Sequence, residues 1–367
     1  MHKNRQPMRP IWVDPIDGMI RVIDQRRLPH KLEILKICTP DEMVQAIRHL
    51  VVRGAPLIGA SGAYGMVLAA KTTAGLAEPD TALTEAARHL ISARPTAVNL
   101  AWAVDRMLSR ILSADSGNDR ISLALKEADA ILDAEVDNCR KIGNNGFALI
   151  QQIHSAKPGQ PIQILTHCNA GWLACIEYGT ATAPIYAAFD AGIDIHVWVD
   201  ETRPLNQGAR LTSWELGQYG VPHTLITDNA GGHLMQHGMV DMVIVGADRV
   251  ARSGDAANKI GTYLKALAAW DNHLPFYVAI PSTTFDWTIQ NGVQEIPIET
   301  RDPDEVRYVD GLYDGRIVQV LVPQACCPVA NHAFDVTPAR LITGLITERG
   351  VCAANEADIL RLFPERA

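Results

Sequence analysis

Polar side chains follow five apolar runs beyond residue 160, most of them rich in Ile and Val. The residues after these runs are His167-Cys168-Asn169, Asp200-Glu201-Thr202-Arg203, Asp228-Asn229, Asp248-Arg249 and Pro281-Ser282-Thr283-Thr284. If the runs are parallel strands of one open sheet, their carboxyl ends meet at a single edge, where ligands bind. The sequence therefore predicts that groups capable of acid, base and nucleophilic chemistry converge there.

Cys168 stands between the run ILT and an expected helix start at Ala170-Gly171. Exposed N–H groups and the helix dipole at such a position favour a thiolate, which would serve as a base or a nucleophile. An isolated cysteine is more often a buried core residue. The position at a strand end favours the catalytic interpretation.

Asp248 follows the apolar run MVIVGA, in which Gly246 and Ala247 have no polar side chain to interact with its carboxyl group. Loss of solvent around a carboxyl group favours its protonated form, which suits a general acid. The alternative is a helix N-cap or an ion-pair partner of Arg249 or Arg252. A place on the same sheet edge as Cys168 favours the acid.

Three short segments could bind an anion. They are Arg53 with the backbone of Gly54-Ala55, Arg94 ahead of Pro95-Thr96, and Asn258-Lys259 at the expected start of a helix. Cationic side chains and helix N-termini are the usual partners of phosphate groups. Each segment is a weak signal alone, because most Arg and Lys side chains are simply solvated.

No metal or nucleotide cofactor is indicated by the motifs. His233 and His237 are spaced i, i+4, but HLMQH lacks the glutamate of a metalloprotease helix, and no third ligand is evident. The stretch RGAPLIGASGAYG lacks GxGxxG spacing, so its small residues are expected to allow close helix packing. The pair Cys326-Cys327 is expected to pack in the core.

Composition limits the possible partners and location. The 367 residues include 33 Lys and Arg against 41 Asp and Glu, which gives a formal charge of −8. No block of basic residues could follow a phosphodiester backbone, so no nucleic acid partner is expected. An anionic small substrate is compatible with this balance. No segment has about 18 uncharged apolar residues, so we expect no membrane association and a cytoplasmic location. Seven scattered cysteines do not indicate a disulfide framework.

The order of the elements predicts an α/β fold in two parts. Two short β segments surround Asp17-Gly18, and long helical patterns fill the rest of the first third of the chain. Beyond HSAKPGQ, apolar runs alternate with helical segments, which is typical of a parallel sheet covered by helices on both faces. We predict an N-terminal, mostly helical domain over residues 1–155 and a Rossmann-like domain over residues 156–367.

Several long blocks resemble one family. They are RGAPLIG at 53–59, LTHCNAG at 165–171, DETRPLNQGARLTSWEL at 200–216, GADRV at 246–250, and the Asn258-Lys259 pair followed by IGTY. Together, over about residues 10 to 338, they resemble the methylthioribose-1-phosphate isomerases of methionine salvage. Several blocks in the same order are far more specific than one short motif.

The resemblance implies residue roles, an activity and an assembly. The family's catalytic residues fall on Cys168 and Asp248, and its substrate contacts fall on Arg53, Gly54, Ala55, Arg94, Gln207, Asn258 and Lys259. The implied reaction converts the sugar phosphate 5-methylthioribose 1-phosphate to 5-methylthioribulose 1-phosphate without a cofactor. The implied architecture is a helical domain on a Rossmann-like domain, in a homodimer.

Two rival interpretations remain at this stage. Isomerases of the same superfamily act on ribose 1,5-bisphosphate or 5-deoxyribose 1-phosphate and would share Cys168 and Asp248. The regulatory subunits of the eukaryotic initiation-factor exchange complex have a similar fold, but they act as binding scaffolds. A scaffold has no need of the Cys and Asp pair, so the pair favours an enzyme. Hydrogen transfer through an enediol and transfer as a hydride both remain open.

Overall fold

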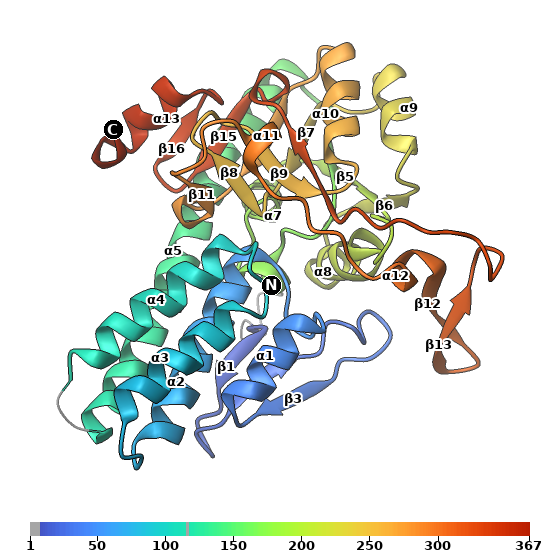
Figure 1. Ribbon diagram of the computed structural model, residues 1–367. Helices are drawn as coiled ribbons and strands as arrows, with labels where there is room; N and C mark the ends of the chain where they lie inside the picture. Colours follow the sequence, from blue (N-terminus) through green and yellow to red (C-terminus); the bar gives the residue numbers. More distant parts are fainter. Residues whose placement is uncertain (1–7, 115–116) are drawn as a thin grey trace.

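A computed structural model, which describes residues 8–114 and 117–367, places a helical bundle beside a layered α/β unit (Figure 1). The predicted class, a mostly helical N-terminal part followed by a Rossmann-like part, is confirmed. Residues 1–7 and 115–116 of the expected first domain lie outside the described residues. No described helix is long and apolar enough to cross a membrane.

The first third of the chain opens with a small antiparallel sheet and continues as a bundle. The sheet consists of β1 (Ile11–Val13), β2 (Ile20–Ile23) and β3 (Ile34–Ile37), and the bundle of α1 (Pro40–Arg48), α2 (Ala55–Thr73), α3 (Pro79–Ile91), α4 (Val98–Leu112) and α5 (Gly117–Ala156). Gly18 has the positive φ of 67° that a tight turn between β1 and β2 requires. The sequence patterns did not identify β3 and α3.

Helix α2 lies at the centre of the bundle and is buried on nearly every side. A Cβ atom on Gly62 would lie 2.7 Å from a methyl group of Leu100, and one on Gly65 would lie 2.6 Å from a methyl group of Leu90. Glycine at these positions lets the neighbouring helices approach closely. The prediction that this glycine-rich stretch serves helix packing is therefore confirmed.

The α/β unit is built on a seven-stranded sheet in the order β16-β15-β10-β7-β4-β5-β6. Its strands are β4 (Ile162–Thr166), β5 (Ile195–Asp200), β6 (His223–Ile226), β7 (Met242–Val245), β10 (Phe276–Ala279), β15 (Gly344–Thr347) and β16 (Gly350–Cys352). All neighbours are parallel except β16, which runs antiparallel at one edge. The strand order changes direction between β4 and β7, the place where open α/β sheets form a crevice.

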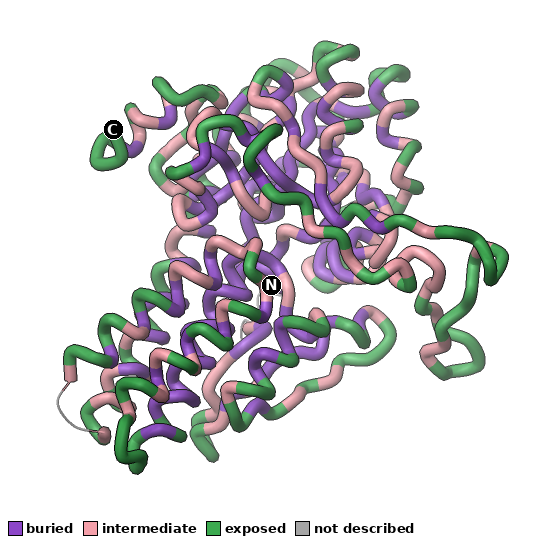
Figure 2. The backbone as a smooth tube through the Cα atoms, viewed as in Figure 1, coloured by how far each residue is buried: buried purple, intermediate pink, exposed green. Residues whose placement is uncertain are grey.

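Alternate residues of the central strands enter separate cores on the two faces of the sheet. Ile164 and Ile244 pack with residues of α5, α7 (Thr182–Asp190) and α8 (Ser213–Tyr219). Leu165 and Val245 pack on the other face with α9 (Ala230–Gln236), α10 (Thr262–Asp271) and α13 (Glu356–Leu362). Figure 2 shows the resulting buried interior. Burial on both faces explains why these strands are continuous apolar runs.

Smaller elements surround the edge of the sheet. A four-stranded sheet has the order β11-β8-β9-β14, and β12 and β13 form a hairpin that projects from the body of the molecule (Figure 1). These elements are β8 (Arg249–Ala251), β9 (Ala256–Lys259), β11 (Phe285–Asp286), β12 (Tyr308–Tyr313), β13 (Arg316–Leu321), β14 (Phe334–Thr337), α6 (Trp172–Cys175), α11 (Gly292–Glu295), α12 (Asp304–Arg307), a π-helical turn (Gly208–Thr212) and 3₁₀ turns at Ser282–Thr284, Ala339–Leu341 and Pro364–Arg366.

Helix α5 joins the two parts of the molecule. Its 40 residues make it about 60 Å long. Ala124, Ala128 and Ile131 belong to the core of the bundle, whereas Ile142 and Ile150 belong to a core under the sheet. The helix therefore ties the bundle to the sheet along its whole length, and the boundary near residue 155 stays a prediction.

Glu135, in the middle of α5, is buried at this junction and accepts a hydrogen bond from the Thr283 hydroxyl (3.0 Å). Its Oε2 atom has no hydrogen-bond partner among the described residues. Burial raises the pKa of Glu135 to about 7. Below about pH 7 the folded protein thus favours the neutral carboxyl group.

We expect Glu135→Gln to stabilise the protein at pH 8. The folded-state pKa lies above the ordinary value of 4.5, so stability is lost as pH rises from 4.5 through about 7. A neutral amide avoids that loss, by about 3 kcal/mol at most. Urea unfolding at pH 5 and pH 8 measures the difference, with exposed Glu85→Gln on α3 as control. A difference that does not grow with pH would contradict the prediction.

Candidate active site

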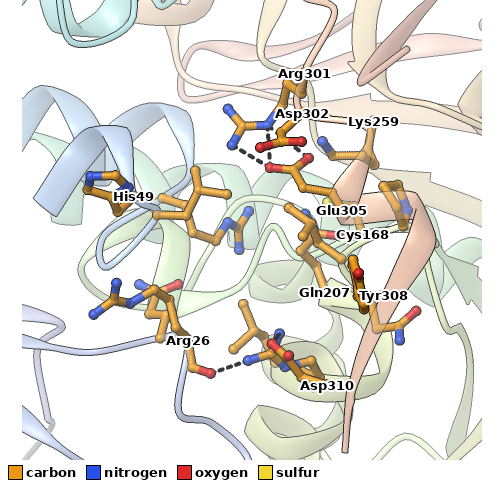
Figure 3. A pocket seen from close by; sticks show the side chains of 18 of the residues that line it. Arg26, His49, Cys168, Gln207, Lys259, Arg301, Asp302, Glu305, Tyr308 and Asp310 are labelled. Carbon is orange, nitrogen blue, oxygen red and sulfur yellow. Dashed lines mark hydrogen bonds and ion pairs between the residues drawn. The ribbon is translucent and has the colours of Figure 1, made fainter. Parts of the chain in front are cut away.

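Cys168 and Asp248 lie together at the crevice between β4 and β7. Cys168 stands two residues after the end of β4, and Asp248 stands three residues after the end of β7. Both line one cavity of about 470 Å³ between the helical bundle and the sheet (Figure 3). The two residues selected from their strand-end positions thus share one site, and their catalytic roles stay predictions.

The substrate-binding residues predicted from the sequence gather around the same pair. Arg53, Gly54, Arg94, Gln207 and Lys259 line the 470 Å³ cavity. Ala55 and Asn258 line a smaller space of about 30 Å³, which also touches Cys168 and Asp248. The bundle contributes the residues numbered below 100 and the α/β unit contributes the others. The structure therefore brings all nine predicted site residues together.

Cys168 is held in an unusual backbone conformation with a φ of 66°. A non-glycine residue in the left-handed region is uncommon and needs support from its surroundings. The Cys168 N–H donates to Thr202 Oγ1 (2.9 Å), and the Thr212 hydroxyl donates to the Cys168 carbonyl (2.6 Å). Hydrogen bonds on both sides thus fix the direction of the Cys168 side chain, which is only 7% exposed.

Burial raises the pKa of the Cys168 thiol, although the positive charges of Arg53 and Lys259 oppose that shift. The helix that follows, α6, has only four residues and begins at Trp172. So short a helix has too few aligned peptides to build the dipole that the sequence interpretation assumed. The dipole assumed in the sequence interpretation is thus missing, and burial favours the protonated form of the Cys168 thiol.

The N-terminus of α2 faces the cavity beside Arg53. Gly54 is the N-cap residue with a φ of 102°, and no side chain caps this end of the helix. The first N–H groups of a helix have no partner within the helix, so they are available to an anion. A Cβ atom on Gly54 would lie 2.4 Å from the Ala174 Cβ, which excludes larger residues. Arg53 is held in place by hydrogen bonds to the Asn169 side chain and carbonyl.

Lys259 and Arg94 place two more cations at the cavity. The Lys259 side chain is buried, and burial lowers the pKa of its ammonium group. Its Nζ atom lies 4.3 Å from the centre of the Phe334 ring, which stands opposite Lys259 in the pairing of β9 with β14. Arg94 forms an ion pair with Glu299 (3.2 Å). Gln207 adds a buried amide whose Oε1 atom has no hydrogen-bond partner among the described residues.

The sequence analysis missed one segment of the cavity wall, residues 299–308. Arg301 pairs with Glu299 (2.7 Å) and with Glu305 (2.6 Å), and Tyr308 lines the same cavity as Gln207 (Figure 3). The segment reads ETRDPDEVRY, whose charges are typical of a solvated surface. No local pattern could have identified it, because the segment reaches the cavity only in the folded chain, where Glu299 pairs with the distant Arg94.

One group in the described part of the chain has the spacing of a metal site. Ligand atoms of His167, Asp200 and Asp228 lie within 4.8 Å of one another. Lys265 already places its ammonium group 2.7 Å from Asp200, and both Asp228 oxygens accept backbone N–H bonds from Thr202 and Arg203 at 2.8 Å. The local positive charge is thus supplied by a side chain, and the group forms a polar network.

The cysteine pair Cys326-Cys327 is exposed, so the expectation that it packs in the core is wrong. It lies beyond the end of β13, in a stretch that pairs with no strand of the main sheet. Residues 324–328 are all exposed, so no apolar layer covers the pair.

Comparisons with known proteins agree over nearly the whole chain. The model of the initiation factor 2 subunit family matches residues 51–354. A methylthioribose-1-phosphate isomerase of Desulfatibacillum aliphaticivorans is 60% identical over 367 residues, the full length of both chains. The solved structure of a 5-methylthioribose 1-phosphate isomerase from Pyrococcus horikoshii has a TM-score of 0.83 at 36% identity, with both chains fully covered.

A third similar protein carries a different description. The solved structure from A. fulgidus, described as the delta subunit of the translation initiation factor eIF-2B, has a TM-score of 0.79 at 40% identity. It covers 97% of this chain and is itself covered to 99%. An enzyme and a protein described as a translation factor subunit therefore share this fold.

Proposed function

This chain belongs to the initiation factor 2 subunit family, and we propose that the cavity around Cys168 and Asp248 is the active site of its isomerase activity. The chain is an aldose–ketose isomerase that converts 5-methylthioribose 1-phosphate to 5-methylthioribulose 1-phosphate. One observation carries the assignment of the site, namely the convergence of the thiol, the carboxyl group and the uncapped end of α2 on one cavity.

The reaction makes two chemical demands. A sugar phosphorylated at its anomeric carbon cannot open spontaneously, so an acid must protonate the ring oxygen as its bond to C1 breaks. Hydrogen must then move from C2 to C1, either through an enediol or as a hydride, and protons must be added to or removed from the sugar oxygens. Both steps call for positioned acid and base groups shielded from bulk water.

We assign protonation of the ring oxygen to Cys168 and the proton transfers on the C2 side of the sugar to Asp248. The sequence interpretation favoured the opposite assignment, on the assumption that the thiol ionises easily. Because burial raises the pKa of Cys168, its thiol holds a proton to donate at neutral pH. No hydrogen bond or ion pair within the described chain engages the Asp248 side chain, which leaves its carboxyl oxygens for the substrate.

The phosphate group is proposed to bind at the N-terminus of α2. Backbone N–H groups near Ala55 and the Arg53 guanidinium group provide donors there, and the buried Lys259 ammonium adds a charge. Asn258 and Gln207 offer amide groups to the sugar hydroxyls. Arg94, held by Glu299, completes the set on the bundle side.

The rest of the lining favours a methylthio group over a second phosphate. Apolar side chains on that part of the cavity are Leu50, Leu205, Leu211 and Val309. Three of its arginines are already engaged, since Arg26 pairs with Asp24, Arg210 with Asp310 and Arg301 with Glu305. A bisphosphate substrate would have to break such pairs, whereas a thioether methyl group gains from apolar contact.

A turnover assay with the purified protein tests this function. We expect 5-methylthioribose 1-phosphate to be converted to the ketose, and ribose 1,5-bisphosphate to be converted at least tenfold less efficiently in kcat/KM. Unchanged substrate after prolonged incubation, with correctly folded protein, would instead support a binding scaffold of the kind that the A. fulgidus description suggests.

Lys259→Met is expected to weaken kcat/KM by about one to three powers of ten. Methionine keeps the length of the side chain beside Phe334 but removes the charge that binds the phosphate group. Steady-state kinetics measure the effect, with the exposed Lys71→Met on α2 as control. Kinetics equal to those of the wild type would place the phosphate elsewhere.

We also propose a homodimer that works in the cytoplasm, in methionine salvage. The resemblance to the isomerase family supports these assignments, and the absence of a spanning helix among the described residues is compatible with them. Light scattering of the purified protein tests the assembly, and a monomer mass would contradict it.

A further inference from the structure

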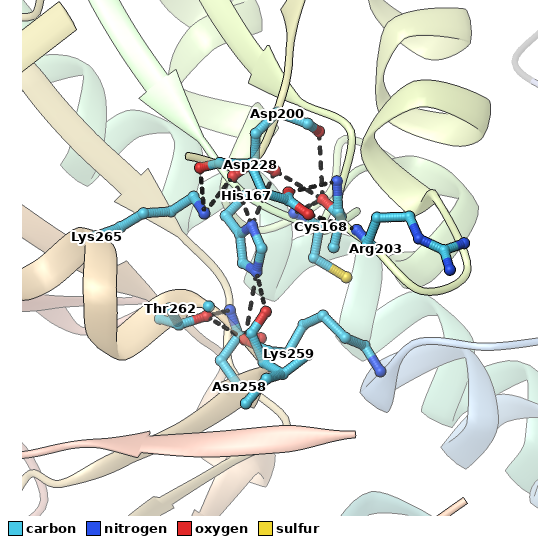
Figure 4. Close-up of polar contacts among 12 residues, drawn as sticks. His167, Cys168, Asp200, Arg203, Asp228, Asn258, Lys259, Thr262 and Lys265 are labelled. Atoms are coloured by element: carbon cyan, nitrogen blue, oxygen red, sulfur yellow. Dashed lines mark hydrogen bonds and ion pairs between the residues drawn. The ribbon is translucent and has the colours of Figure 1, made fainter. Parts of the chain in front are cut away.

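A buried polar network lies behind the catalytic cavity, with His167 at its centre (Figure 4). The His167 ring is 1% exposed and stands between the ends of β5 and β9. Its Nδ1 atom lies 2.7 Å and 2.8 Å from the two oxygens of Asp200. Its Nε2 atom lies 3.3 Å from the Lys259 carbonyl and 3.0 Å from the Ile260 carbonyl.

Both ring nitrogens of His167 face acceptor oxygens only. A neutral imidazole has one N–H and one lone pair, so it could satisfy only one side of this arrangement. Both contacts are hydrogen bonds when each nitrogen carries a proton. The Asp200 carboxylate, which also pairs with Lys265 (2.7 Å), balances the charge of such a ring. Burial opposes ionisation of Asp200, but His167 and Lys265 outweigh it and lower the pKa of the carboxyl group.

The two sides of the ring lead to two different site residues. On one side, Asp200 accepts a bond from the Thr202 hydroxyl (2.7 Å), and Thr202 Oγ1 accepts the Cys168 N–H (2.9 Å). On the other side, the ring holds the backbone of Lys259 directly. Figure 4 shows the Cys168 sulfur and the Lys259 ammonium group on the same side of the network, away from Lys265.

We propose that His167 is a positioning residue that sets Cys168 and Lys259 in register for the isomerisation. The ring lies between the ends of β4, β5 and β9. Its two N–H groups therefore fix the distance between Cys168, which follows β4, and Lys259, which ends β9. The inference rests on the proposed function of this cavity. A misplacement of about 1 Å between reacting groups can cost about 100-fold in rate.

Two substitutions separate the sides of the ring. The side-chain amide of Asn can replace the Nδ1 donor toward Asp200, whereas the longer amide of Gln can replace the Nε2 donor toward the carbonyls. We expect His167→Gln to stay within about tenfold of wild-type kcat, because Lys265 still holds Asp200 when the Nδ1 donor is lost. We expect His167→Asn, which removes the ring's donor to the Lys259 and Ile260 carbonyls, to lose about 100-fold. Exposed His30→Asn and His30→Gln are the controls. Equal kcat in the two His167 variants, at equal unfolding temperature, would overturn the proposal.

A second pair of variants covers the case in which a His167 substitution does not fold. Thr202→Val keeps the branched shape but removes the hydroxyl that accepts the Cys168 N–H, whereas Thr202→Ser keeps it. We expect the Val variant to lose at least about tenfold in kcat and the Ser variant to stay within about threefold. Equal rates for Val and Ser would count against the arm of the network that reaches Cys168.

An independent readout separates failure of this inference from failure of the proposed function. Wild-type turnover of 5-methylthioribose 1-phosphate tests the function alone. The rate at which iodoacetamide alkylates Cys168, followed by mass spectrometry, tests the network without any substrate. We expect Cys168 to react at least fivefold faster in Thr202→Val than in Thr202→Ser, because its backbone anchor is lost. Equal alkylation rates would contradict the inference even if the enzyme is active.

Discussion

Cys168→Ser is expected to fold normally and to lose at least about three powers of ten in kcat. Serine keeps the hydrogen bonds that Thr202 and Thr212 make with the backbone at this position, so the left-handed conformation should survive. A hydroxyl group is a far weaker acid than a thiol, so it cannot supply the proton that opens the ring. Stopped assays of ketose formation, with circular dichroism as the folding check, measure the result.

The matched control is Cys326→Ser, which changes the same atom at an exposed position outside the cavity. It should leave turnover within about twofold of the wild type, a change expected of a surface substitution. If Cys168→Ser kept more than a tenth of wild-type kcat, the loss would be below about 1.4 kcal/mol, and Cys168 could not be an essential acid.

Asp248→Asn is expected to cause a loss of similar size while substrate still binds. The amide keeps the volume of the side chain at the end of β7 but cannot take up a proton during transfer from C2. The cations at the proposed phosphate site, Arg53 and Lys259, are untouched, so the dissociation constant of the substrate should change by less than about threefold. Isothermal calorimetry with the inactive variant measures that constant directly.

Exposed Asp105→Asn on α4 serves as the control, since it makes the same chemical change far from the cavity. The assignment predicts that kcat falls and binding survives in Asp248→Asn alone. Weak binding with nearly normal kcat would make Asp248 a binding group and leave the C2 step to another residue.

The sequence by itself determined the fold class and identified residues that gather at one cavity. Continuous apolar runs indicate strands buried on both faces, and in such a sheet polar residues at strand ends must meet at one edge. This reasoning found Cys168 and Asp248 without any structure. The blocks around Arg53, Gln207 and Lys259 added the substrate residues through resemblance. An apolar run and the polar residues after it are neighbours in the sequence, so one sequence is enough to recognise them.

Strand β15 shows where that reasoning stopped. Its four residues, Gly344–Thr347, lie inside the main sheet between β10 and β16, yet they were not recognised as a strand. Its strand conformation depends on hydrogen bonds to β10, which lies more than 60 residues earlier in the chain.

Only the tertiary structure decided the protonation and the support of the site. Burial, which depends on how the bundle and the sheet pack together, raises the pKa of the Cys168 thiol, and the local sequence around it indicated the opposite direction. The acceptors around His167 come from β5 and β9, and Glu299 reaches Arg94 across more than 200 residues. Electrostatic environments are sums over neighbours in space, so a linear sequence specifies which groups can react, while the folded chain determines their charge and their partners.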